Sequence, residues 1–160
     1  MDKITKNSPK RLLVVDAVDD LAKQLFGDKY DYHITTTQYD PLEALDKLDK
    51  PRWSTVLGDE ATELFDMGRS LKNEVLVNVA ITTKIPDNHL AHAIPYLEDV
   101  ETIKNELVGR EIEHKDNVIY GNVQNEEYPT WSVRHDIDYT VGVLFILFSI
   151  VLVIFDNDRD

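Results

Sequence analysis

The sequence contains no cysteine, and it has few basic side chains for its length. Without cysteine, disulfide frameworks, Cys-ligated zinc, haem thiolates and thiol nucleophiles are excluded. The 17 Lys and Arg stand against 30 Asp and Glu, which gives a net charge of −13 over 160 residues. Such a surface should repel nucleic acid, because duplex affinity comes mainly from basic side chains that neutralise phosphates. The acidity has two explanations at this point: plain solubility, or a surface that must not adhere to a polyanion.

Motifs for acyl transfer and for phosphate binding are also missing. No G-x-S-x-G, no G-x-G-x-x-G and no G-x-x-x-x-G-K-[ST] occurs in the sequence. The N-terminal apolar stretch is interrupted by Asp16, Asp19 and Asp20, which is not typical of a signal peptide, so we expect synthesis in the cytoplasm. The sequence therefore indicates a structural or binding protein and not an enzyme. We expect no catalytic residues, no cofactor and no metal site.

Two groups of residues are candidates for metal ligands, and each has a simpler interpretation. His89 and His92 stand three apart on a predicted helix, but no third ligand lies near them in the sequence, which favours solvent-exposed side chains. His135, Asp136 and Asp138 lie in a predicted extended segment. Side chains alternate along a strand, so Asp136 and Asp138 share one face and His135 points to the other. These three residues cannot converge on one ion.

Adjacent carboxylates and one buried hydroxyl are the remaining candidates for chemistry. General acid–base work requires a carboxyl group in an apolar pocket with a raised pKa. We expect the carboxylate pairs to lie in loops or on a polar helix face, where water solvates them. Ser149 lies within an apolar run and is expected to be a core hydroxyl that bonds to the backbone. The pairs are Asp19 with Asp20, Asp59 with Glu60, and Glu126 with Glu127.

The longest apolar run covers residues 141–155 and is followed at once by a charged C-terminus. As a helix, fifteen residues would rise only about 22 Å, against about 30 Å for the hydrocarbon core of a bilayer. Asp136 and Asp138 precede the run, and no Lys/Arg cluster flanks it to set an orientation. Val, Ile and Phe fill ten of its fifteen positions, which suits a strand. We therefore expect a buried strand and not a tail anchor.

Hydrophobic periodicity predicts a single domain over residues 1–160 in which helices and strands do not alternate regularly. Helices are expected at residues 9–26, 40–48 and 87–109, the last one capped by Asp87 or Asn88 and kinked or divided at Pro95. Strands are expected at residues 30–38, 53–57, 74–83, 118–123 and 131–139, and then over the final run.

Loop excursions are expected near 58–70 and 110–132. The order predicts an α+β fold, with a mostly antiparallel sheet and two main helices packed on one face. The final run would be its central strand, covered by helices on one face and by a partner or a second sheet on the other.

One succession of features resembles a known family. A strand rich in Val and Ile leads into Ile85-Pro86-Asp87-Asn88-His89-Leu90, and a helix follows with an internal Ile94-Pro95 and a terminal Glu106-Leu107-Val108-Gly109. A short strand comes next, and Phe148-Ser-Ile-Val-Leu-Val-Ile-Phe155 forms the last one. In this pattern the chain resembles the tail terminator proteins of bacteriophages with long non-contractile tails.

The resemblance implies a structural protein of the virion, assembled in the host cytoplasm, that closes into a homohexameric ring at the head-proximal end of the tail tube. The ring would end polymerisation of the tail tube protein and would offer the surface to which the head-completion protein of the connector attaches. DNA would only pass through its lumen, and no membrane is involved. The family's functional residues follow no fixed motif, so none is assigned here.

Three alternatives stay open. Another head–tail junction component, such as a head-closure or tail-completion protein, shares the size and the oligomeric habit. A small membrane-tethered protein anchored by residues 141–155 is the second. An enzyme or small-ligand binder is the third, although the sequence supplies no constellation for it.

Overall fold

The computed structural model describes residues 4–36, 49–65, 67–121, 133–140 and 142–156, and for residues 65, 133–137 and 140 it describes the backbone alone. Over these residues the fold is α+β, as the sequence predicts. Two helices and one short 3-10 turn accompany a seven-stranded sheet. The elements are α1 (Lys10–Phe26), η1 (Gly27–Lys29), β1 (Asp31–Thr35), β2 (Arg52–Phe65), β3 (Ser70–Lys84), α2 (Leu90–Leu107), β4 (Glu111–His114), β5 (Asn117–Tyr120), β6 (Val133–Thr140) and β7 (Val143–Asp156).

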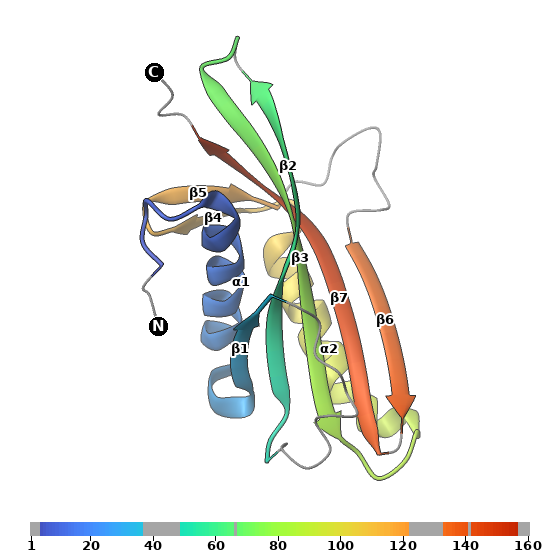
Figure 1. Cartoon of the computed structure of the whole chain (residues 1–160). Coiled ribbons are helices and arrows are strands. Elements are labelled where there is room, and N and C mark those ends of the chain that lie inside the picture. The colour runs from blue at the N-terminus through green and yellow to red at the C-terminus, as the bar shows by residue number, and fades with distance from the viewer. Residues whose placement is uncertain (1–3, 37–48, 66, 122–132, 141, 157–160) are drawn as a thin grey trace.

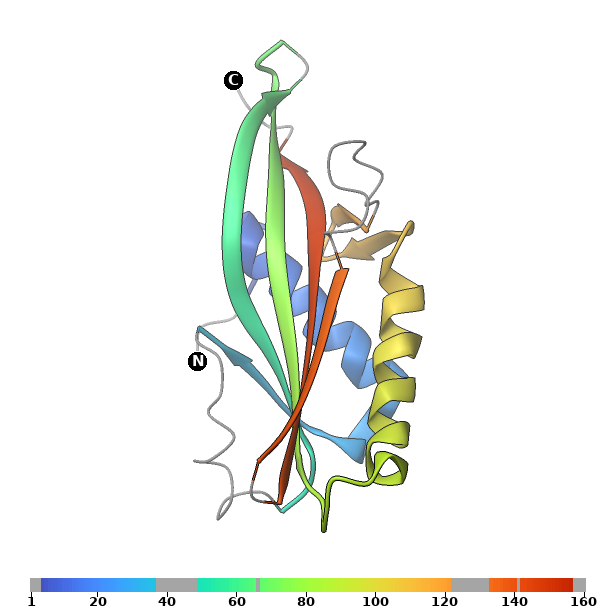
Figure 2. The ribbon, with the colours of Figure 1, turned by 90° about the vertical axis from the view of Figure 1, so that its right-hand side faces the viewer.

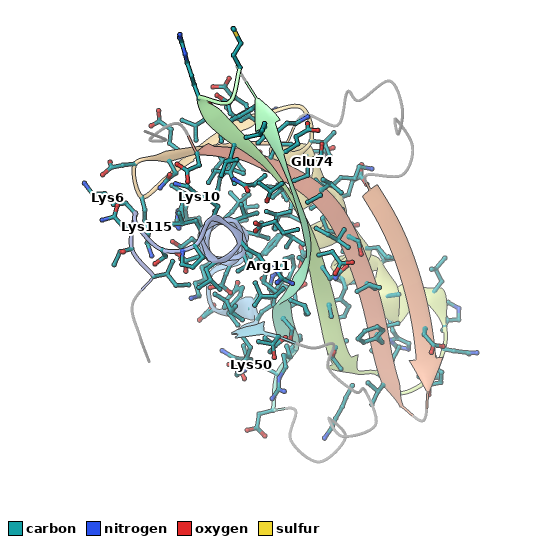
Figure 3. The ribbon with its side chains drawn as sticks, turned by 45° about the horizontal axis from the view of Figure 1, so that its top comes forward. Lys6, Lys10, Arg11, Lys50, Glu74 and Lys115 are labelled. Atoms are coloured by element: carbon teal, nitrogen blue, oxygen red, sulfur yellow. The ribbon has the colours of Figure 1, made fainter. Side chains whose placement is uncertain are left out.

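The sheet has the order β1-β2-β3-β7-β5-β4, and β6 also pairs with β7. All its pairings are antiparallel except the one between β1 and β2, so the sheet is mostly antiparallel, as the sequence predicts, and one parallel pair makes it mixed. Both helices pack on the same face, and the opposite face carries neither of them (Figures 1 and 2). The sheet curls around α1, which Figure 3 shows end-on.

The C-terminal apolar run is β7, the central strand of the sheet. It pairs along its whole length with β3, and on its other side first with β6 and then with β5. The side chains that face the helices are 0–2% exposed: Leu144, Ile146, Phe148, Ile150, Leu152 and Ile154. The prediction of a buried strand is confirmed. Among the described residues, no helix is both long enough and apolar enough to span a bilayer.

Strand β2 corrects the predicted excursion at 58–70, because the strand does not end at Leu57 but continues to Phe65. Gly58 is the reason for the misreading, since a glycine followed by polar residues is typical of a loop. In the structure it belongs to a bulge, where two residues of β2 stand opposite Leu76 of β3. A Cβ at position 58 would lie 2.2 Å from the Leu76 carbonyl oxygen, so only glycine allows this approach.

The second predicted excursion, near 110–132, is also partly wrong. Strands β4 and β5 occupy its first half as a hairpin, and residues 122–132 lie outside the described part of the chain. The turn of the β4–β5 hairpin consists of Lys115 and Asp116, both with positive φ (48° and 63°). Positive φ values at both turn residues match the strand twist that two-residue hairpin loops require. The helix predicted at 40–48 lies outside the described residues as well.

Helix α2 differs from its prediction at two points. The cap is His89, and not Asp87 or Asn88, and its Nδ1 accepts a hydrogen bond from the Ala91 amide at 3.1 Å. Pro95 lies inside a continuous helix and does not divide it. It stands in the second turn, where it removes only the hydrogen bond to the Ala91 carbonyl. Tertiary packing outweighs that loss, because the residues that bury the helix against the sheet are Ala93, Val100, Ile103 and Leu107.

Candidate functional site

The face of the sheet opposite the helices is apolar along its central strand. The second row of β7 side chains lies there, and its members are half-buried: Phe145, Leu147, Val151, Val153 and Phe155. Leu76 of β3, directly opposite Val151, extends the row to the neighbouring strand. An antiparallel sheet with one solvated face normally alternates apolar and polar residues. The open face defined by these six side chains departs from that pattern, and its side chains are half-buried within the subunit.

The centre of the open face is fixed by a hydrogen bond between side chains. Ser149 Oγ of β7 donates to Asn78 Oδ1 of β3 at 2.6 Å. Ser149 is buried, as the sequence predicts, but its partner is a side chain and not the backbone. The strand backbone is already engaged in ladder bonds on both sides, which leaves the cross-strand amide as the partner within reach.

Strand edges adjoin the open face on both sides. Only residues 52–56 of β2 pair with β1, and within the described residues no strand pairs with the outer edge of β2 from Leu57 to Phe65. The same holds for the outer edge of β6. Unpaired backbone N–H and C=O groups along such edges are templates for pairing with another chain. Within the described residues, the open edges of β2 and β6 therefore flank the open face.

A polar cluster ties the β4–β5 hairpin to α1. His114 Nε2 and Lys115 Nζ each lie 2.7 Å from Asp16 Oδ2, and His114 Nδ1 lies 3.7 Å from Asp20 Oδ2. Lys115 also donates to the Ile4 carbonyl at 2.6 Å. Figure 3 shows Lys115 beside the start of α1, where Lys10 and Lys6 also lie.

Asp16, Asp20 and His114 offer ligand atoms within 4.8 Å of one another, a spacing that a metal ion could use. However, the Lys115 ammonium and the His114 imidazole already approach the Asp16 oxygen that would bind such an ion. A cation in that position would have to displace the lysine. We therefore assign the cluster a structural role. Asp16 and Asp20 stand four apart on one helix face, a signal present in the sequence, but His114 is 98 residues away and could not be paired with them in advance.

The carboxylates of α1 differ in their pKa. Burial alone would raise the pKa of Asp16, but the hydrogen bonds from Lys115 and His114 outweigh it and hold the pKa below its ordinary value. Burial raises the pKa of Asp19 despite its bond to Lys23 at 2.8 Å. The expectation that Asp19 is solvated is wrong, because Asp19 lies on the buried side of α1 and is only 3% exposed. Its Oδ1 has no hydrogen-bond partner among the described residues.

The other candidate residues stay apart. His89 Nδ1 is engaged in capping α2, and although Asp87 Oδ1 lies 3.3 Å from His92 Nε2, no three ligand atoms of this region converge within metal-binding spacing in the described part of the chain. Asp59 and Glu60 are exposed, as expected, although on a strand and not in a loop. In β6 the backbone register alternates as predicted: His135 pairs with Phe148, and Asp136 with Leu147. Glu126 and Glu127 lie outside the described residues.

Comparison with known proteins gives the fold and nothing finer. No protein-family model matches the sequence, and no curated protein matches it. Solved structures are similar to it. One of them, of a protein that bears a sequence identifier in place of a functional name, aligns with a TM-score of 0.50 and 9% identity over 91% of this chain and 92% of that chain. At this identity the similarity supports a shared fold alone.

Proposed function

We propose that this chain is the subunit of a tail terminator of the kind found in bacteriophages with long non-contractile tails. It forms a homohexameric ring that caps the tail tube, ends polymerisation and presents the surface to which the head-completion protein attaches. The single observation that carries this proposal is the open face of the sheet. In the isolated subunit the apolar row on the central strand is only half-buried, whereas a subunit that adds to a polymer end can bury it fully against its neighbour.

The arrangement of surfaces also supports a ring. The open edge of β2 and the open edge of β6 lie on opposite sides of the sheet, so two copies can meet through different surfaces. A contact between unlike surfaces is heterologous and closes into a ring when its rotation divides the circle. The net charge of −13 suits a lumen through which DNA passes without being retained. None of the polar clusters described above has the geometry of a catalytic centre, which favours an assembly role.

The test is a tube-growth assay with tail tube protein from the same virus. Tube protein is polymerised with and without the purified chain, and tube lengths are measured by negative-stain electron microscopy. We expect a six-fold density at one end of each tube and an arrest of growth at substoichiometric amounts. Tubes that elongate at an unchanged rate would refute the proposal. Binding to purified connectors without binding to tubes would instead identify a head-closure or tail-completion protein.

A further inference from the structure

Four large hydrophobic side chains are exposed in the described part of the chain, and they form two pairs at opposite ends of the molecule. Leu64 (65% exposed) and Met67 (96%) lie at the tip of the β2–β3 hairpin, and Leu90 (63%) and Ile94 (43%) lie on the first turns of α2. The fifteen-residue strand β3 separates the two ends by about 45 Å at 3.3 Å per residue. Figure 1 shows the hairpin tip and the start of α2 at opposite ends of the sheet. The two pairs cannot cover each other within one subunit.

The hairpin tip breaks two local rules at the same residue. Met67 has a positive φ of 56°, a region in which hairpin loops normally place Asn, Asp or Gly. Its apolar side chain is also almost fully in water. The positive φ serves the hairpin turn, as it does at Lys115 and Asp116, but an exposed Met at this position does not help the monomer fold. A strained and apolar residue retained at an exposed turn indicates a functional contact. Arg69 follows on the same tip, is exposed, and makes no ion pair with any residue that the structure describes.

The start of α2 presents a matching row. Leu90, Ile94 and Glu98 stand four residues apart, so they line one side of the helix, and all three are exposed. The Glu98 carboxylate makes no ion pair among the described residues, in contrast to Glu101, which pairs with Lys104 at 3.1 Å. The row therefore offers two apolar side chains and an unpaired acid. The tip offers two apolar side chains and an unpaired base.

We infer that the hairpin tip of one subunit docks on the Leu90–Ile94–Glu98 row of a second copy of this chain, with Arg69 paired to Glu98. The unbranched Met67 side chain adapts to the gap between Leu90 and Ile94. The contact joins unlike surfaces, so it is heterologous. The three tip side chains, Leu64, Met67 and Arg69, bury less than the roughly 800 Å² per partner of a stable interface. This contact therefore sets the orientation of a larger interface between subunits, to which the open face contributes. The inference rests on the proposed function only where the contact is required to close a ring.

Charge reversal tests the contact in a way that separates it from simple damage. We expect Arg69→Glu and Glu98→Arg each to raise the concentration needed for self-association at least about tenfold, because each places like charges opposite one another. A 1:1 mixture of the two variants should assemble with wild-type affinity. In an alternating ring every tip that carries the new acid meets a row that carries the new base, and every unchanged tip meets an unchanged row. The double variant Arg69→Glu/Glu98→Arg should also recover.

Matched controls are Arg110→Glu and Glu106→Arg, which reverse exposed charges beyond the tip and the row and should leave assembly unchanged. Self-association is measured by sedimentation velocity and native mass spectrometry, with and without tail tube protein. Single variants that assemble like the wild type, a mixture that fails to recover, or a wild-type chain that self-associates under neither condition would each overturn the inference.

The assay also separates this inference from the proposed function. If Met67→Asp abolishes tube binding but leaves self-association intact, the tip contacts the tube protein, and the inference is wrong while the function stands. If the variants complement one another in self-association but the wild type never arrests tube growth, the contact stands and the function is wrong.

Discussion

Removal of strand β7 should unfold the whole domain. A chain that ends at Phe145 loses the strand that joins β3 to β6 and β5, and with it the five deepest side chains of the helix-facing row, each at most 1% exposed: Ile146, Phe148, Ile150, Leu152 and Ile154. Full burial of one such side chain contributes about 1.5–3 kcal/mol. Five of them contribute roughly 8–15 kcal/mol, which is comparable to the about 5–15 kcal/mol that stabilises a typical domain.

Two point substitutions on β7 test separately the buried face and the open face of this strand. Phe148 is fully buried against the helices, whereas Phe145 is half-buried on the open face. Phe148→Ala should lower the free energy of unfolding by about 3–5 kcal/mol, because it removes buried surface and leaves a cavity. Phe145→Ala should cost only about 1 kcal/mol, because the Phe145 ring buries less apolar surface when the isolated subunit folds. The same chemical change on one strand thus has two expected sizes.

Urea unfolding followed by circular dichroism measures both variants and the truncated chain. The two point variants should shift the midpoint without changing the slope, since the surface exposed on unfolding stays the same. The truncated chain should show no cooperative transition. A truncated chain that still unfolds cooperatively, or equal losses for Phe145→Ala and Phe148→Ala, would refute the assignment of β7 as the core strand with one open face.

Three further predictions concern α1 and the bulge. Asp16→Asn should destabilise the protein by about 1–3 kcal/mol at pH 7, where Lys115 loses its charged acceptor. Because the folded pKa of Asp16 is lowered, its contribution is present above its unfolded pKa and is lost as pH falls through the folded pKa, so the urea midpoints of variant and wild type should converge once the pH is below the folded pKa. Asp19→Asn should maintain or raise the urea midpoint at pH 7, because the raised pKa means that ionised Asp19 opposes folding as pH rises through the folded value; a clear loss at pH 7 would contradict this. Gly58→Ala should lower the free energy of unfolding by about 1–3 kcal/mol, since its Cβ would collide with the Leu76 carbonyl, and an unchanged midpoint would count against the bulge.

The sequence predicts the parts of the fold that hydrophobic periodicity marks. Strand β7 is dense in β-branched and aromatic residues, and α1 keeps a helical spacing of buried residues, so both are correctly placed. The second half of β2 is missed, because Asp59 to Glu63 is exposed and carries no alternation of apolar and polar residues. Gly58 inside a strand pattern is the signal that could have indicated a bulge. The parallel pairing of β1 with β2 has no local signal, since pairing direction is a property of the tertiary fold.

The candidate contact surfaces likewise include parts that a local sequence pattern predicts and parts that depend on the tertiary fold. The apolar character of the open face is visible in the sequence as an uninterrupted run, and the need for a second cover is already predicted there. The hairpin tip is hidden by the misreading of residues 58–70 as a loop, because only a paired β2 and β3 project Met67 beyond the sheet. The cluster of Asp16 with His114 depends on two residues 98 positions apart, which no local pattern joins.

The apolar run of β7 is long because both rows of its side chains are apolar, the row that faces the helices and the row on the open face. The helix-facing row must be apolar, because α1 and α2 cover it. The other row would be free to carry Thr, Lys or Glu, as the solvated faces of antiparallel strands do. Instead it carries Phe145, Leu147, Val151, Val153 and Phe155, and this second row is what makes the segment long and apolar enough to invite comparison with a membrane span. A continuous apolar strand is typical of sheets covered on both faces. We therefore expect a neighbouring molecule to complete the cover of this second row, as the proposed ring requires.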